Sequence, residues 1–223
     1  MHWLNFNDVN LGDSSAKTLF SRMASGTSHI GHVTALYLSS NQIGAEAVAA
    51  LSKLLSADAC CLARLDVSFT RIDARALVDA LKANASLTFL DVRRVSKMAV
   101  EFEAIGELLL RPNSVCRLAY LRCDSFELLE DVTSLSLRET RLDKGAAQLL
   151  TGLLKNNNRT LRELDLGATG FEKAWADNLV AALSTNPALK VIHLPYNPAI
   201  DPESQDAILA SVKERNLRVA IDF

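Results

Sequence analysis

Short stretches of alternating apolar and polar residues return along the whole chain, each followed by apolar residues at helical spacing. The clearest copy covers residues 161–187, in which Leu161, Leu164 and Leu166 alternate with polar residues and glycine. A period of two predicts a strand with one buried face, and the helical spacing predicts a helix. Asn186-Pro187 ends this helix, because the residue before a proline avoids the helical region. One such unit cannot bury its own apolar side but stacked copies can, which predicts a repeat protein.

The strand pattern is L-x-x-L-x-L-x-x-N with substitutions, and its second apolar residue marks each copy. The marked positions are Leu4, Leu36, Leu65, Leu90, Leu118, Leu135, Leu164 and Ile192, with a last strand at Val219. The interval from Leu118 to Leu135 is much shorter than the others. Most of the remaining intervals fall in or near the spacing of long repeats that contain a helix.

VTALYLSSN at 33–41 is the best match to this pattern, and LARLDVSFT at 62–70 and LRELDLGAT at 161–169 follow it closely. On these motifs the chain resembles the ribonuclease-inhibitor-like subfamily of leucine-rich repeat proteins, over nearly all of its 223 residues. The resemblance implies an α/β leucine-rich repeat solenoid, a curved horseshoe with parallel strands on the concave face and helices on the convex face. It implies no particular activity, because the fold serves many unrelated functions.

The repeats predict a single domain over residues 1–223 with about eight to nine repeats. Helices are expected at about 13–23, 45–56, 74–84, 97–110, 143–156, 172–185 and 202–214. Side chains that can accept hydrogen bonds from a first helical turn begin most of them: Asp13 or Ser14, Asp73, Ser96, Asp143 and Asp201. At the ninth pattern position, Asn41 and Asn197 are expected to bond the backbone of neighbouring turns, which the threonines found in other copies do only partly.

The repeat around 118–135 is irregular, because a parallel crossover normally needs a dozen or more residues. Residues 124–131 leave room for one helical turn at most, so we expect no full helix there. Two registers fit the preceding strand: Leu118 and Tyr120 point inward in one, and Leu121 and Cys123 in the other. We prefer the first, because NSVCRLAYLRC then aligns with NPALKVIHLPYN.

Composition excludes several classes of protein. A net charge of −2 argues against nucleic-acid binding, which needs a basic excess. No apolar run approaches the length of a membrane-spanning helix and the N-terminus does not resemble a signal peptide, so we expect an intracellular, cytoplasmic protein without membrane insertion. The four cysteines lack zinc-ligand spacing, and Cys123 is interpreted as a buried free thiol.

The sequence contains no catalytic motif, and its four histidines are scattered over the repeats. His193 is expected on the sheet surface without a partner at hydrogen-bond distance, which a catalytic base requires. We therefore predict no enzyme, no catalytic residue, no cofactor and no metal site.

Aspartates recur at one strand position, in Asp66, Asp91 and Asp165. Adjacent strands lie about 4.8 Å apart, so paired carboxylates could indicate a metal site or an acid–base pair. Because Arg64 and Arg93 flank the first two, we prefer an ion-pair lattice on a solvated face.

The concave strand face is the candidate partner-binding surface. Tyr37 and Phe89 lie two layers apart with Arg64 and Asp66 between them, and exposed aromatic and arginine side chains are typical of interfaces. The predicted partner-binding residues are Trp3, Tyr37, Arg64, Asp66, Phe89, Asp91 and Arg93. The alternative is that they are ordinary surface residues.

Arg93-Arg94-Val95-Ser96 resembles a site for a basophilic kinase, which makes Ser96 a possible phosphorylation site. The plainer interpretation is that Ser96 caps the helix that follows. Phosphate at a helix N-terminus is tolerated, so the two interpretations do not exclude each other.

The leading functional hypothesis is a non-catalytic module or scaffold subunit that binds a protein partner, either alone or as part of a larger complex. One alternative is a GTPase-activating protein of the leucine-rich repeat type, although that group has more repeats and an acidic tail. Another is a structural subunit built permanently into a large assembly.

Overall fold

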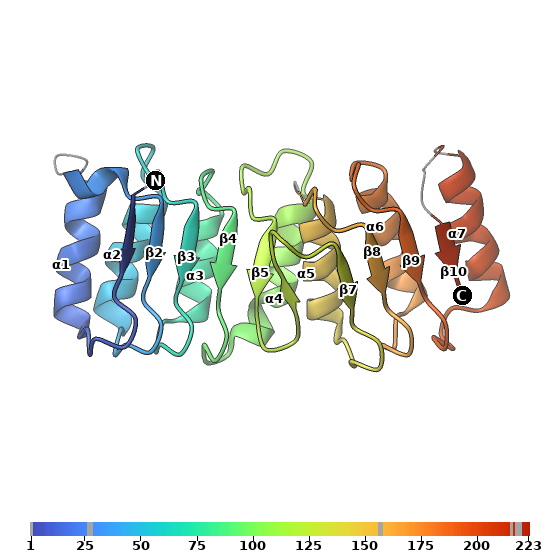
Figure 1. The fold of residues 1–223 in the computed structure, drawn as a ribbon, viewed down its shortest axis with the longest axis horizontal. Coiled ribbons are helices and arrows are strands. Elements are labelled where there is room, and N and C mark those ends of the chain that lie inside the picture. The colour runs from blue at the N-terminus through green and yellow to red at the C-terminus, as the bar shows by residue number, and fades with distance from the viewer. Residues whose placement is uncertain (1, 26–28, 156–157, 215, 217–219) are drawn as a thin grey trace. The chain divides into compact units, whose positions relative to one another are not determined.

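The computed structural model describes residues 2–25, 29–155, 158–214, 216 and 220–223 (Figure 1). The chain forms two compact units. The first consists of Met1–Glu101 and Asn113–Glu127, and the second of Phe102–Pro112 and Leu128–Phe223. The single domain over 1–223 stays a prediction.

The first unit alternates strands and helices. Its elements are β1 (Trp3–Asn5), α1 (Asp13–Ala24), the 3₁₀ helix η1 (His29–His32), β2 (Ala35–Tyr37), α2 (Ala45–Leu55), β3 (Arg64–Asp66), α3 (Ala74–Leu81), β4 (Phe89–Asp91), the start of α4 (Met98–Leu110) and β5 (Tyr120–Arg122). Strands β1 to β5 pair in chain order and all in parallel. The short strand β6 (Glu127–Leu128) follows β5 in the same sheet.

The second unit repeats this order. After the end of α4 it contains β7 (Ser134–Ser136), α5 (Lys144–Lys155), β8 (Glu163–Asp165), α6 (Lys173–Leu183), β9 (Val191–His193), α7 (Pro202–Glu214) and β10 (Ala220–Asp222). Its four strands are parallel and adjacent in chain order. Val219, the predicted mark of the last strand, lies outside the described residues, and Ile221 pairs with Ile192.

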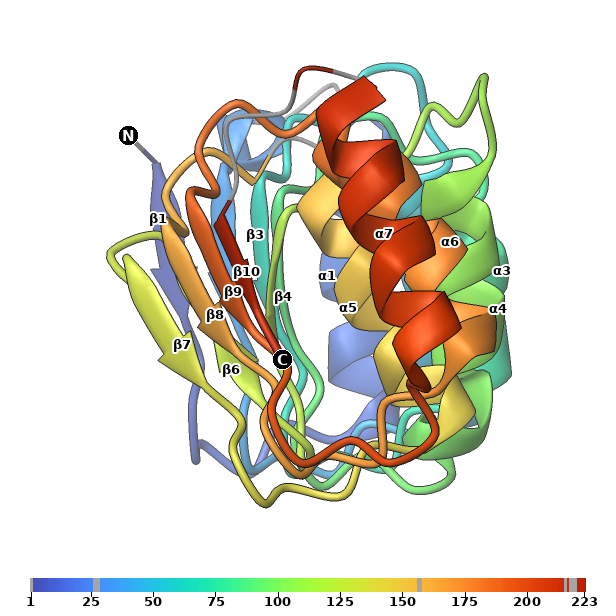
Figure 2. The same ribbon diagram turned by 90° about the vertical axis from the view of Figure 1, so that its right-hand side faces the viewer.

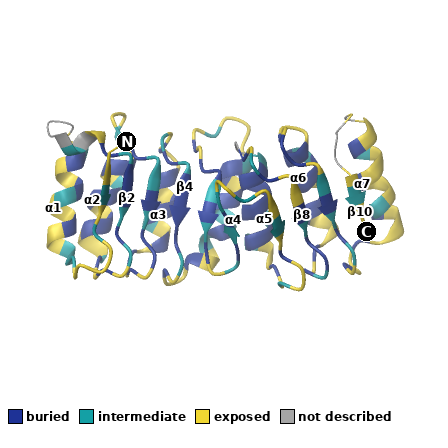
Figure 3. Ribbon diagram, viewed as in Figure 1, coloured by how far each residue is buried: buried dark blue, intermediate teal, exposed yellow. Residues whose placement is uncertain are grey.

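In each unit the helices cover one face of the sheet and leave the other face uncovered (Figure 2). The helices alternate buried and exposed residues along their length, as an amphipathic helix does (Figure 3). The core lies between the two layers, and the second apolar residue of most repeats has no exposed surface: Leu36, Leu65, Leu90, Leu121, Leu164 and Ile192. The α/β leucine-rich repeat fold expected from the sequence is confirmed, and every predicted helix is present close to its expected bounds.

Asparagines at the ninth pattern position connect adjacent repeats. The Asn41 amide donates to the carbonyls of Phe6 and Leu38, and its oxygen accepts from Leu11 N–H. Asn197 makes the same bonds in the second unit, including one across to Leu166. The hydroxyls of Thr70 and Thr169 donate only to a carbonyl of their own repeat. The expected difference between asparagine and threonine is confirmed.

The prediction that Asp13 caps its own helix is wrong. Asp13 caps the helix of the next repeat instead. The N-cap of α1 is Gly12, without a side-chain bond. The Asp13 carboxylate accepts from the N–H groups of Gly44, Glu46 and Ala47 at 2.8–3.1 Å, at the start of α2. Burial works to raise the pKa of Asp13, but these bonds outweigh it and the pKa is lowered. The predicted caps Asp73, Asp143 and Asp201 are confirmed.

The preferred register of the fifth strand is wrong. Leu121 pairs with Leu90 and is fully buried, so Tyr120 and Arg122 are the residues of β5 on the uncovered face. Leu118, Leu121 and Cys123 repeat the spacing of the buried residues in β4 and its flanks, and this places Leu118 at the first pattern position. The interval that ends at Leu135 then begins at Leu121 and is even shorter than predicted. Residues 124–131 contain strand β6 and no full helix, as expected.

Candidate interaction surface

The uncovered sheet face of the first unit, called here the first strand face, consists of two rows of side chains. The strand register places Trp3, Ala35, Arg64, Phe89 and Tyr120 in one row. The other row contains Asn5, Tyr37, Asp66, Asp91 and Arg122. Six of the seven predicted partner-binding residues therefore lie together, and Arg93 lies two residues after the end of β4.

An ion-pair network holds one side of this face. The Asp91 carboxylate is 2% exposed and accepts from Arg93 Nη2 at 2.7 Å and Nε at 3.0 Å. Arg122 Nη1 approaches the same carboxylate to 3.8 Å, and Glu127 binds Arg122 at 3.0 Å and Arg93 at 3.4 Å. The hydrogen bonds to Asp91 raise the pKa of Arg93. The predicted pairing of Asp91 with Arg93 is confirmed. The part played by Arg122 was not predicted, because the preferred register of the fifth strand was wrong.

Phe89 is not the exposed aromatic that the alternation predicts. Its ring is 5% exposed, because the Arg64 guanidinium lies over it at 4.2 Å from the centroid. A guanidinium over an aromatic face is a favourable cation–π arrangement. The exposure predicted for Phe89 and for Asp91 is therefore wrong, and Phe89 supports Arg64 from below.

Asp66 lies on the same strand as Arg64 and beside Asp91 of the next strand. Its Oδ1 accepts from the N–H and the hydroxyl of Ser68, and its Cα pairs with that of Asp91 on the next strand. Burial, aided by the charge of Asp91, raises the pKa of Asp66 in spite of the two bonds from Ser68. Towards the other edge, Tyr37 is half-buried and Trp3 is 61% exposed. The exposed part of the face is thus an aromatic area bordered by fixed charges.

The strand pattern did not identify two exposed aromatic residues, because they lie in turns. The residue four positions after the second leucine has a positive φ in most repeats: Asp8, Ser40, Phe69, Arg94, Glu139, Ala168 and Tyr196. This left-handed conformation is unusual for a bulky side chain. Phe69 and Tyr196 nevertheless occupy it and are 52% and 76% exposed. The recurring turn position was the signal that could have identified them.

The uncovered sheet face of the second unit, called here the second strand face, carries a histidine between two carboxylates. His193 Nε2 lies 3.2 Å from Glu163 Oε1, and Nδ1 lies 3.5 Å from Asp222 Oδ2. The expectation that His193 has no partner at hydrogen-bond distance is wrong, because the register places Asp222 directly beside it. Arg138 lies 3.6 Å from Asp165 and over the ring of Tyr196 at 5.3 Å.

Comparison with known proteins agrees with this architecture. Residues 31–52, which include β2 and its ninth-position asparagine, match the family model described as Leucine Rich repeat. The chain has a leucine-rich repeat fold. Its membership of the ribonuclease-inhibitor-like subfamily stays a prediction.

Two leucine-rich repeat proteins are similar over most of the chain. The human NACHT, LRR and PYD domains-containing protein 13 is 27% identical over 98% of this chain, and the mouse NACHT, LRR and PYD domains-containing protein 5 is 30% identical over 74%. The matched regions make up 22% and 16% of those proteins. The chain therefore spans about a fifth of the length of the relatives that it matches.

The prediction that Ser96 caps α4 is wrong. Lys97 has a φ of 60°, and the N–H groups of Met98 and Val100 donate to the carbonyls of Val95 and Lys97 instead. Ser96 is exposed, but Val95 is buried and Arg93 is bound to Asp91, so this segment is not presented as an extended peptide. Phosphorylation of Ser96 stays a prediction.

Within the described ranges, no three His, Cys, Asp or Glu side chains are grouped closely enough to hold a metal ion. All four cysteines are free, and burial raises the pKa of Cys123 to about 11, so its thiol stays protonated at neutral pH. No described helix has the length and apolar character that crossing a membrane requires.

Proposed function

We propose that the chain is a non-catalytic protein-interaction module that binds a protein partner through its first strand face. The observation that carries this proposal is the fixed arrangement around Arg64, which is held over Phe89 beside the half-buried Tyr37. Ordering a flexible side chain on binding costs about 0.5–1.5 kcal/mol. Arg64, Arg93 and Arg122 are already held in place, so a partner loses less free energy to their ordering.

The partner-contacting centre that we propose is Tyr37, Arg64 and Asp66, with Trp3 extending it. Tyr, Trp and Arg are the residue types that most often dominate binding energy. Phe89 and Asp91 act from beneath, by holding Arg64 and Arg93. The charges on this face are balanced and paired, which favours a mixed protein surface over a polyanion.

The names of the two relatives pair leucine-rich repeats with NACHT and PYD domains. The repeats of those proteins therefore accompany other domains, and we propose that this chain likewise acts together with other protein domains, within a larger complex. No specific contact among the described residues favours a GTPase-activating protein or a permanent structural subunit over a binding module.

The test is a set of binding titrations with the protein that the immobilised chain retains from its native cell extract. We expect Tyr37→Ala and Trp3→Ala each to weaken binding by more than about 1 kcal/mol, as truncation of an aromatic contact at the centre of an interface does. Lys53→Glu is the matched control, because Lys53 is exposed on α2, on the covered side of the sheet.

Circular dichroism and urea midpoints of the same variants show whether the fold is retained. Phe89→Ala is unsuitable for this purpose, because Phe89 is buried and its truncation would also disturb the core. Full affinity in both aromatic variants, or an equal loss in Lys53→Glu, would remove the first strand face as the binding surface.

A further inference from the structure

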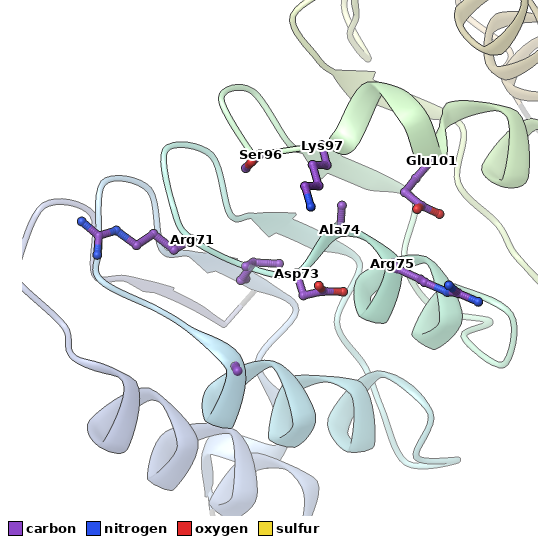
Figure 4. Close-up of a pocket in the computed structure, with 9 residues that line it drawn as sticks. Arg71, Asp73, Ala74, Arg75, Ser96, Lys97 and Glu101 are labelled. Atoms are coloured by element: carbon purple, nitrogen blue, oxygen red, sulfur yellow. The ribbon is translucent and has the colours of Figure 1, made fainter.

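Two adjacent hollows lie in the first unit where β3 and β4 lead into α3 and α4. The larger, of about 510 Å³, lies between the start of α3 and the turn before α4. Lys97 extends into it towards Asp73 and Ala74, with Ser96 beside it and Arg71 at the opposite end from Arg75 (Figure 4). The smaller, of about 410 Å³, shares Arg71 and is also lined by Phe69 and Arg94. The two hollows thus form one depression around Arg71, called here the Arg71 depression.

The charge of the Arg71 depression is opposite to that of the chain. Four cations and two carboxylates line it: Arg71, Arg75, Arg94 and Lys97, against Asp73 and Glu101. The whole chain carries a formal charge of −2. One of these carboxylates already has a hydrogen bond, because Asp73 caps α3 and its Oδ1 accepts from the N–H of Ala76. An anion therefore meets a local positive field on an acidic protein.

Two of these cations form no ion pair with the described residues. In the part of the chain that the structure describes, neither the Arg71 guanidinium nor the Lys97 ammonium has a hydrogen-bond or ion-pair partner. By contrast, Arg93 and Arg122 are paired with carboxylates, and Arg94 lies 3.9 Å from Asp124. An unpaired guanidinium presents a planar set of donors that matches a carboxylate.

An apolar contact borders the same depression. Phe69 is 52% exposed and has a φ of 55°, a conformation that suits glycine or asparagine better than a bulky residue. The ring is therefore held towards solvent in a strained turn, two residues before Arg71 and in the same hollow. Ile72 and Ala74 add apolar surface to the larger hollow.

We propose that the Arg71 depression is a docking site for an acidic peptide segment of a protein partner. Its carboxylates pair with Arg71 and Lys97, and an apolar side chain of the peptide contacts Phe69. A small ligand would need an enclosed pocket that covers most of its surface, whereas these hollows are open and contiguous. This site is separate from the first strand face and does not depend on the function proposed for it.

The test uses the whole chain and a short fluorescent peptide that combines several Glu residues with a few Leu residues, at low salt. The control peptide carries Gln in place of every Glu. We expect only the Glu peptide to bind. Arg71→Glu and Lys97→Glu should each weaken it by at least about threefold, because each replaces an exposed attraction with a repulsion. Lys53→Glu, the same charge change on α2, should leave the affinity unchanged.

Phe69→Asn separates a binding role from a structural one. Asparagine tolerates the left-handed turn, so the urea midpoint should stay the same or rise while the affinity for the Glu peptide falls. Tyr37→Ala should not change peptide binding, so failure here and failure of the proposed function are distinguishable.

Three results would overturn the proposal. One is equal binding of the Gln peptide, and another is an equal loss in Lys53→Glu. The third is tighter binding of a single-stranded oligonucleotide with the same dependence on Arg71 and Lys97, which would assign the site to nucleic acid instead.

Discussion

The two sheets carry an aspartate at the same strand position, but its surroundings differ completely. In the first unit, Asp91 is 2% exposed and bound by Arg93, with Arg122 nearby. In the second unit, the Asp165 side chain is 21% exposed, and Arg138 approaches it only to 3.6 Å. The repeat position determines which way a carboxylate points. The side chains on neighbouring strands determine whether it is buried.

The size of those neighbours accounts for the difference. Asp91 lies between Asp66 of β3 and Arg122 of β5, and the long side chains of Arg93 and Arg122 both reach its carboxylate. Strand β6 adds Glu127 at the edge, which binds Arg122. Asp165 lies between Ser136 of β7 and His193 of β9, and neither is an arginine. On the second strand face Asp165 is therefore half-buried, and the Glu163 and Asp222 side chains on either side of His193 are 50% and 69% exposed.

The largest expected effect is the loss of stability when a core leucine is truncated, and this loss should be similar in the two units. Leu65 and Leu164 are fully buried at the same pattern position. Leu65→Ala and Leu164→Ala should each lower the free energy of unfolding by about 2–5 kcal/mol, because each leaves a cavity in a layered core. Urea unfolding of both variants measures this. A loss below about 0.5 kcal/mol in either variant would place that leucine on the surface.

These leucines also show how far the sequence could be interpreted. Each repeat combines one stretch of period two with one of helical period, and both bury the same side. The repeat positions, the helices and the role of Asn41 and Asn197 therefore followed from the pattern. The fifth strand did not, because Leu118 and Leu121 flank Ala119 and Tyr120 so that two alternations fit equally well.

The site was less predictable, because exposure depends on contacts between strands. Phe89 alternates as an exposed residue does, but the guanidinium of Arg64 on the neighbouring strand lies over its ring. The partners of His193 come from the strands on both of its sides, and no single repeat contains them. Phe69 and Arg71 lie in and just after a turn, which a strand pattern does not describe.

A smaller expected effect tests the aspartates themselves. Asp91→Ala should lower the free energy of unfolding by about 2–4 kcal/mol, because it leaves two arginines without their buried partner. The value lies below that for a fully buried pair, since both guanidiniums are about a third exposed. Asp165→Ala should cost less than about 1 kcal/mol, as an exposed ion pair does.

Urea midpoints of the two variants in low and high salt complete this comparison. Salt screens exposed pairs more than buried ones, so the small effect of Asp165→Ala should shrink further and that of Asp91→Ala should persist. Equal losses in both variants would mean that the repeat position, and not its neighbours, determines the energy of these carboxylates.

The smallest expected effect depends on pH and concerns Asp66. Its pKa is raised by burial, so the folded chain holds this proton more tightly than the unfolded chain. Its contribution to stability is then fully present below the unfolded pKa of about 3.9, and it is lost as pH rises through the folded pKa. At neutral pH the ionised carboxylate therefore opposes folding.

Asp66→Asn removes this charge but keeps an oxygen that accepts from Ser68. At pH 7 it should raise the free energy of unfolding by up to about 0.5 kcal/mol, a small change typical of sites outside the core. The gain should shrink as pH falls towards 4, in urea unfolding series at both pH values.

Asp13→Asn is the control, and its effect on stability should have the opposite sign, because the pKa of Asp13 is lowered by its bonds to α2. Its carboxylate stabilises the fold above the unfolded pKa, so the variant should lose stability at pH 7, and the difference should shrink as pH falls through the folded pKa. A loss of stability at pH 7 in both variants would show that burial does not determine the ionisation of Asp66.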